Sequence, residues 1–149
     1  METIHFSILI HADKRKVWDT MLQDKSYREW SREFQAGSCY EGSWTKGSEI
    51  RFLAPDDSGA MRGLFSRIKD NIPYQYISIE HLGVIDNGVV DTTSDEVKKW
   101  TPSFENYTFA ESGDSTKLAI DMQIEPDYKS MFEEMWPRAL KALKSLCER

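Results

Sequence analysis

The side chains best suited to acid–base chemistry lie on two segments that alternate like β-strands. His81 shares an apolar face with Ile77 and Ile79, and Glu105 and Tyr107 share one face of a later segment. A carboxyl group in an apolar pocket has a raised pKa, as many general acids do. If either set points inward, it would place an acid–base or hydrogen-bonding group in a cavity. In the alternative, Glu105 faces solvent and Tyr107 is a wall residue with a satisfied hydroxyl.

The other reactive residues form no catalytic or metal-binding pattern. The histidines are His5, His11 and His81, and no H-x-H, H-E-x-x-H or C-x-x-C motif occurs. Cys39 has no assigned base, and there is no Gly-x-Ser-x-Gly elbow or glycine-rich phosphate loop. We therefore assign no catalytic residue, no metal ligand and no cofactor from the sequence.

The strongest structural signal is the end of the chain. Between residues 128 and 147, apolar residues recur at helical spacing for about five turns. Pro137 lies inside this pattern, and we expect a kink there because an interior proline removes one backbone hydrogen bond. The apolar positions are Tyr128, Met131, Phe132, Met135, Trp136, Ala139, Leu140, Leu143, Leu146 and Cys147.

The start of the chain predicts a strand followed by two short helices. Residues 3–10 alternate between an apolar and a more polar face. Asp13 can cap a helix whose inner face includes Trp18, and Asp24 begins a second helix that carries Tyr27 and Trp30. Two short helices at this point would close one end of a sheet.

The middle of the chain predicts an antiparallel sheet. Strands are expected at residues 50–53, 61–69, 74–82, 104–111 and 117–125. Asn87-Gly88 indicates a hairpin turn, and Ser94 can cap a short helix that ends near Trp100.

Composition and charge narrow the possible partners. The 149 residues fit a single domain, residues 1–149, with a net charge of −6. This charge argues against nucleic acid and anionic membrane surfaces as partners. No segment approaches the ~18 apolar residues of a membrane span, and no leader-like segment precedes the first strand. We expect a cytoplasmic protein with free thiols at Cys39 and Cys147, and leave its oligomeric state open.

The order of elements and several local details carry a family resemblance. The details are Val17-Trp18, Trp30, Gly42, Trp44, Gly47, Ile50, Pro73, Glu105, Tyr107, Thr108, Phe109, the turn Gly113-x-x-Thr116, Trp136, Leu140 and Leu143-Lys144. With them the chain resembles the START-like superfamily, also called SRPBCC or birch-pollen-allergen-like. Within it, the chain is similar to the branch named after the activator of heat-shock-protein ATPase.

The resemblance implies an α+β helix-grip fold, in which a curved antiparallel sheet wraps around the C-terminal helix. Members bind lipids, sterols, polyketides or other apolar molecules between sheet and helix. A few members are cyclases or dehydratases, and a eukaryotic branch stimulates a chaperone ATPase. These motifs describe the fold and do not select one function.

We expect the protein to bind a small hydrophobic molecule, either lipid-like or a polyketide or aromatic compound, between the sheet and the last helix. One alternative is a cyclase or dehydratase, which needs an ionisable residue buried in that cavity. Another is a protein-interaction module acting on a chaperone ATPase, which a filled interior would favour. The residues predicted to form the cavity wall are Trp18, Tyr27, Trp30, Phe65, His81, Trp100, Tyr107, Met122, Met131 and Met135.

Overall fold

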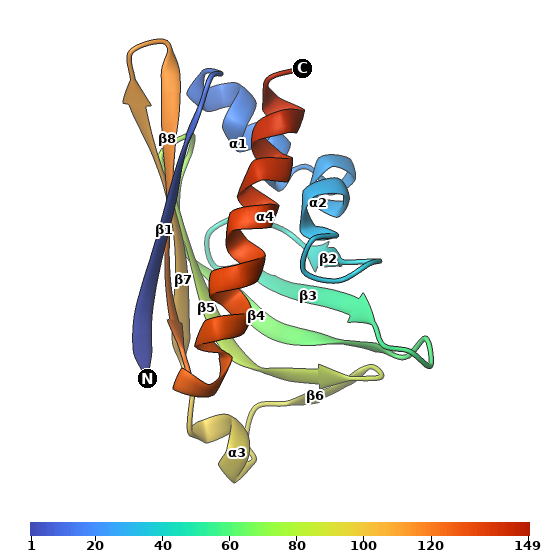
Figure 1. Cartoon of the computed structure of the whole chain (residues 1–149). Coiled ribbons are helices and arrows are strands. Elements are labelled where there is room, and N and C mark those ends of the chain that lie inside the picture. Colours follow the sequence, from blue (N-terminus) through green and yellow to red (C-terminus); the bar gives the residue numbers. More distant parts are fainter.

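The computed structural model describes residues 1–149 and confirms an α+β helix-grip fold (Figure 1). A curved antiparallel sheet wraps around one long helix, and two short helices follow the first strand. The strands are β1 (Glu2–Ile10), β2 (Cys39–Gly42), β3 (Glu49–Pro55), β4 (Met61–Ile72), β5 (Tyr76–Asp86), β6 (Val89–Asp91), β7 (Ser103–Ser112) and β8 (Ser115–Ile124). The helices are α1 (Lys14–Leu22), α2 (Asp24–Ser31), α3 (Asp95–Lys98), a 3-10 turn (Pro126–Tyr128) and α4 (Lys129–Cys147).

The sheet has the strand order β1-β8-β7-β5-β4-β3-β2, and β6 adds to β5. Every pairing is antiparallel. The predicted alternation is present in β8, where Leu118, Ile120, Met122 and Ile124 are all buried. These residues face α4 on the inner side of the sheet, where the main core lies.

The pairing of β4 with β5 is interrupted twice. Ser66 pairs with His81 while Phe65 pairs with Gly83, so Leu82 has no partner. Further along, Ile68 pairs with Ile79 and Asp70 with Ser78, which leaves Lys69 unpaired. Such bulges bend a strand and increase its twist. The two bulges lie on either side of the short stretch of paired residues that contains Ser66 and His81.

The short helices and the hairpin begin where the sequence predicts. The Asp13 carboxylate accepts a hydrogen bond from the Lys16 backbone N–H at 2.9 Å, which caps α1. The Ser94 hydroxyl accepts one from the Val97 backbone N–H and caps α3. Asn87 and Gly88 have φ angles of 49° and 86°, the positive values that a tight hairpin turn requires.

The last helix is held unevenly along its length. Its second half buries Ala139, Leu140, Leu143 and Cys147 against the sheet and the short helices. In its first half Met131 is exposed, and Phe132 and Met135 are only partly buried. Helix α4 continues through Pro137, and a kink there stays a prediction. No helix is both long enough and apolar enough to cross a membrane.

Candidate functional site

A cavity of about 970 Å³ lies between the concave face of the sheet and the loosely packed half of α4. Its volume is within the range of small-molecule sites, about 300–1,000 Å³. Most of its wall is apolar and comes from α2, from the inner face of the sheet and from α4. The apolar wall includes Tyr27, Trp30, Phe34, Phe52, Leu64, Val84, Tyr107, Met122, Met131, Phe132, Met135 and Trp136.

Most of the residues predicted to form the cavity wall are found there. The eight that line the cavity are Tyr27, Trp30, His81, Trp100, Tyr107, Met122, Met131 and Met135. Their part in binding a ligand stays a prediction. Phe34, Phe52, Phe132 and Trp136 also line the cavity and were not in the predicted set, although Trp136 and Phe132 belong to the same helical stripe as Met131 and Met135.

Trp18 does not line the cavity. Its ring packs against Phe109 at 5.1 Å and Tyr74 at 5.7 Å between ring centroids. The helical pattern of α1 correctly placed Trp18 toward the sheet, but α1 covers a different part of the sheet from the cavity. A helical stripe shows which face of a helix is inward and not which part of the sheet it meets.

Phe65 also lies outside the cavity. It packs with Cys39, Leu53 and Ile85 in a small separate cluster. The Arg51 guanidinium lies over its ring, 5.7 Å from the centroid. The inward position next to it on β4 is occupied by Ser66, which pairs with His81. The prediction for Phe65 was wrong because β4 places a serine inward and a phenylalanine outward.

Polar side chains form a continuous hydrogen-bonded chain beside the cavity. The Ser66 hydroxyl lies 2.7 Å from His81 Nδ1, and His81 Nε2 lies 3.1 Å from Glu105 Oε1. The Tyr107 hydroxyl donates to Glu105 Oε2 at 2.5 Å. Both His81 and Glu105 line the cavity, and their side chains are 7% and 13% exposed. Glu105 therefore points inward, and the alternative in which it faces solvent is wrong.

The hydrogen bonds define which atoms carry protons when Glu105 is ionised. An ionised carboxylate only accepts, so His81 Nε2 must carry a proton that it donates to Glu105. In neutral His81, Nδ1 then accepts from the Ser66 hydroxyl. Ser66 is fully buried and does not line the cavity, so it orients His81 and cannot itself meet a ligand.

Two tyrosines next to Glu105 stay protonated at neutral pH. Burial raises the pKa of Tyr107 well above its ordinary value, and the negative charge of Glu105 adds to the effect. Burial, followed by the Glu105 charge, also raises the pKa of Tyr27. Ser31 lines the same cavity, and its hydroxyl oxygen is buried without a hydrogen-bond partner. The inner part of the cavity thus combines an apolar wall with phenol groups, one unpaired hydroxyl and the Glu105 carboxylate.

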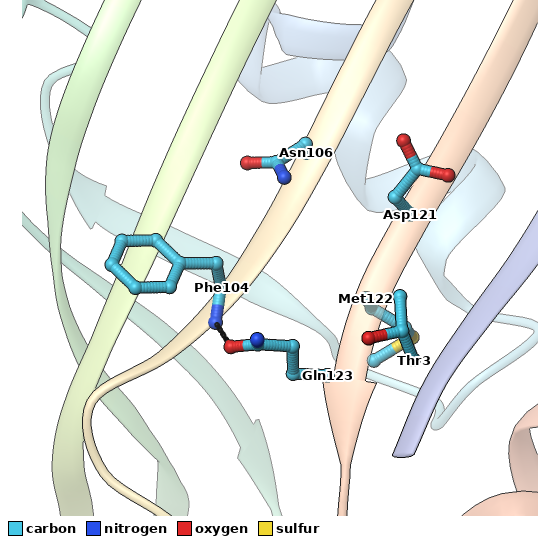
Figure 2. A pocket seen from close by; sticks show the side chains of 6 residues that line it. All are labelled: Thr3, Phe104, Asn106, Asp121, Met122 and Gln123. Atoms are coloured by element: carbon cyan, nitrogen blue, oxygen red, sulfur yellow. Dashed lines mark hydrogen bonds between the residues drawn. The ribbon is translucent and has the colours of Figure 1, made fainter. Parts of the chain in front are cut away.

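A second, smaller pocket of about 210 Å³ lies on the other face of the sheet (Figure 2). It is lined by Thr3, Phe104, Asn106, Asp121, Met122 and Gln123. The Gln123 side chain accepts a hydrogen bond from the Phe104 backbone N–H at 3.1 Å across its floor. No group of three or more His, Cys, Asp or Glu side chains converges in the structure to hold a metal ion.

Comparison with known proteins identifies the fold. No family model matches the chain, and no curated protein sequence matches it. A Mesorhizobium loti protein is similar in structure, with a TM-score of 0.73 and 16% identity over 99% of this chain and 98% of that one. The Aha1 dimer of Colwellia psychrerythraea has a TM-score of 0.70 and 16% identity, covering 99% and 97% of the two chains. A Chromobacterium violaceum protein has a TM-score of 0.69 and 18% identity, covering 100% and 99%.

These likenesses extend over nearly the whole chain, and at this level of identity they concern its fold. The fold implied by the resemblance predicted from the sequence agrees with them. The chain therefore has an Aha1-like helix-grip fold of the START-like, SRPBCC type.

Proposed function

We propose that this protein binds a small hydrophobic molecule in the cavity between the sheet and α4. The observation that carries the proposal is the cavity itself, about 970 Å³ in size and walled mainly by aromatic and methionine side chains. A ligand that buries about 400 Å² of apolar surface would gain ~10 kcal/mol at ~25 cal/mol per Å². Association and ordering oppose this gain by about 4 kcal/mol or more, which leaves at most ~6 kcal/mol, a dissociation constant of roughly tens of micromolar.

The test uses N-phenyl-1-naphthylamine, a neutral dye that fluoresces in apolar surroundings, with two matched variants. Val84 lines the cavity opposite Leu64, so Val84→Trp would fill part of the cavity. Val89 lies just beyond the hairpin turn, is 69% exposed and does not line the cavity, so Val89→Trp is the control.

We expect the wild-type protein and Val89→Trp to bind the dye equally, and Val84→Trp to lose about tenfold or more in affinity, a difference of ~1.4 kcal/mol. Native mass spectrometry of protein purified from its own host should show a co-purifying apolar molecule. A protein that binds neither dye nor host molecule, or a Val84→Trp variant that binds the dye unchanged, would refute the proposal.

The hydrogen-bonded pair of His81 and Glu105 favours an enzyme as the second candidate. A cyclase or dehydratase needs an ionisable group buried in the cavity, and Glu105 occupies such a position. A suitable test follows hydrogen–deuterium exchange at the central carbon of 1-phenylbutane-1,3-dione by NMR. Catalysis predicts faster exchange with the wild-type protein than with Glu105→Gln. Equal rates would leave binding as the only activity of the cavity.

The third function considered from the sequence, a module acting on a chaperone ATPase, has less support. A filled interior would favour it, whereas the structure contains a large cavity. The similarity to Aha1 is one of fold, at 16% identity, and it transfers no partner to this chain.

A further inference from the structure

The mouth of the cavity is rich in negative charge. Four carboxylates that line it come from β6, α3 and the segment leading into α4; they are Asp91, Glu96, Glu125 and Asp127. The positively charged residues among the lining are Arg62, Lys99 and Met1, which carries the terminal amino group. An excess of one charge in a concave site attracts the opposite charge and repels its own.

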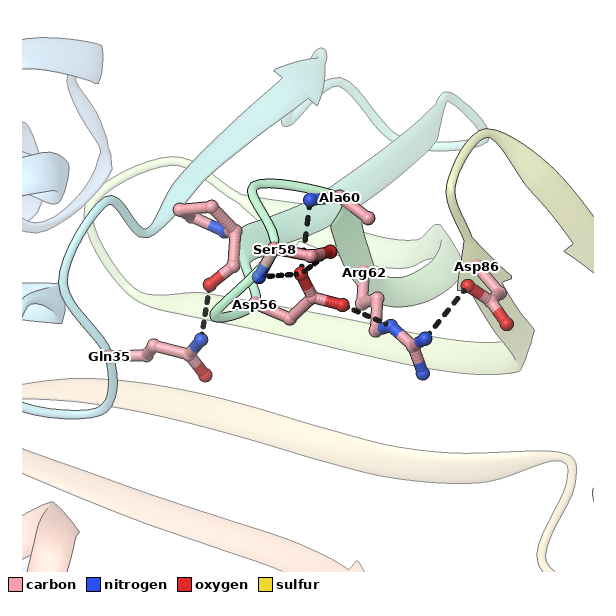
Figure 3. A network of polar contacts seen from close by, with 7 residues as sticks. Gln35, Asp56, Ser58, Ala60, Arg62 and Asp86 are labelled. Atoms are coloured by element: carbon pink, nitrogen blue, oxygen red, sulfur yellow. Dashed lines mark hydrogen bonds and ion pairs between the residues drawn. The ribbon is translucent and has the colours of Figure 1, made fainter.

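Arg62 does little to balance these carboxylates because its guanidinium is already paired. Its Nε donates to Asp56 Oδ2 at 2.8 Å, and another of its nitrogens lies 3.5 Å from Asp86 Oδ1 (Figure 3). Asp56 is held in turn by hydrogen bonds from the Ser58 hydroxyl and from the backbone N–H groups of Ser58 and Ala60. Lys99 and the amino group of Met1 are therefore the positive groups of the lining that form no ion pair, against four carboxylates.

Deeper in the cavity, the wall contains one further carboxylate, that of Glu105. Its partner within ion-pair distance is His81, and no lysine or arginine pairs with it. Two hydrogen bonds, from His81 and Tyr107, leave acceptor positions free, because a carboxylate accepts about four. Two aromatic side chains are linked to this position: the Tyr107 hydroxyl donates to Glu105, and the Glu105 charge contributes to the raised pKa of Tyr27. Such rings also favour cations.

The geometry points to a ligand that joins an apolar body to a cationic amine, with the amine on the Glu105 carboxylate and the apolar body against the aromatic wall. This inference rests on the proposed function and specifies its ligand class. A carboxylate or phosphate headgroup in the same position would meet the Glu105 carboxylate, where no lysine or arginine pairs with it, and it would lose water against a like charge. The same cavity would therefore discriminate strongly between apolar molecules that differ only in headgroup charge.

The experiment compares three molecules with the same twelve-carbon chain: dodecylamine, dodecan-1-ol and dodecanoic acid. Each displaces N-phenyl-1-naphthylamine at pH 7, below its micelle-forming concentration. We expect the amine to bind about tenfold or more tighter than the acid, with the alcohol between them. An acid that binds as tightly as the amine would overturn the inference while leaving the hydrophobic cavity intact. Failure of all three would overturn the proposed function instead.

Variants assign the preference to one side chain. Glu105→Gln keeps the shape of the wall and removes its charge, so the amine should lose its advantage over the alcohol while the alcohol still binds. Glu80→Gln is the matched control, because Glu80 is a buried glutamate on the adjacent strand that pairs with Arg67 and does not line the cavity. An amine preference that persists in Glu105→Gln, or disappears equally in Glu80→Gln, would refute the role of Glu105. If Glu105→Gln does not fold, the comparison of the three molecules on the wild-type protein still decides the inference.

Discussion

The two halves of α4 should respond differently to the removal of side-chain volume. Leu143 is fully buried in the tightly packed half. Substituting alanine there should destabilise the protein by about 3–5 kcal/mol, because the loss of buried methyl groups adds to the creation of a void. Met135 already borders the cavity and is only partly buried. Met135→Ala enlarges an existing space, so we expect a cost of about 1 kcal/mol or less.

Urea unfolding followed by circular dichroism at the helix band would measure both variants. For a domain of this size, about 1 kcal/mol corresponds to a shift in melting temperature of about 2–4 °C. Leu143→Ala should therefore melt well below Met135→Ala in a thermal scan. Equal losses would mean that α4 is packed uniformly along its length, which would contradict the uneven packing on which the cavity depends.

Two smaller predictions concern hydrogen bonds. Tyr107→Phe should destabilise the protein by about 1.5–3 kcal/mol in urea unfolding, because the hydroxyl bonds a carboxylate in a buried site; an unchanged stability would show that this bond contributes nothing. The Ser58 hydroxyl lowers the pKa of Asp56, with further lowering by backbone N–H groups and Arg62. A lowered pKa gives stability that is present above the unfolded pKa and is lost as pH falls through the folded pKa. NMR titration should find the Asp56 pKa below that of an ordinary aspartate and closer to it in Ser58→Ala; the same pKa in both proteins would contradict the assignment to Ser58.

The elements of the fold were predictable where one periodicity extends over many residues. Helix α4 and strands β1 and β8 each have a hydrophobic repeat over many residues, and each repeat fits only one type of secondary structure. Strand β2, Cys39–Gly42, was not predicted because four residues with a glycine at the end carry no detectable alternation. The ends of β4 and β5 were predicted too short, since the bulges at Leu82 and Lys69 interrupt the pattern that defines a strand.

The site was predictable in part, for a different reason. Residues on α4 were placed in the cavity wall correctly because a helical stripe defines a face. Carboxylates are usually exposed, and this tendency favoured a solvent-facing position for Glu105. The sequence also does not indicate that Glu105 pairs with His81, because the two residues are 24 positions apart. Trp18 and Phe65 were misplaced because apolar character does not specify which of two clusters, or which part of the sheet, a side chain joins.

The two unpaired residues, Leu82 and Lys69, have a consequence for how this protein tolerates change. Side chains alternate along a strand, so every residue beyond an extra one has its orientation inverted relative to a regular ladder. Deleting Leu82 would remove the bulge: Gly83 would directly follow His81 and stay opposite Phe65, and Val84 would stay opposite Leu64 with its side chain in the cavity wall. Loss of the bulge residue would therefore reduce the bend and twist of β5 while leaving the wall residues on the inner face, so the extra residue sets the curvature of the sheet around the cavity.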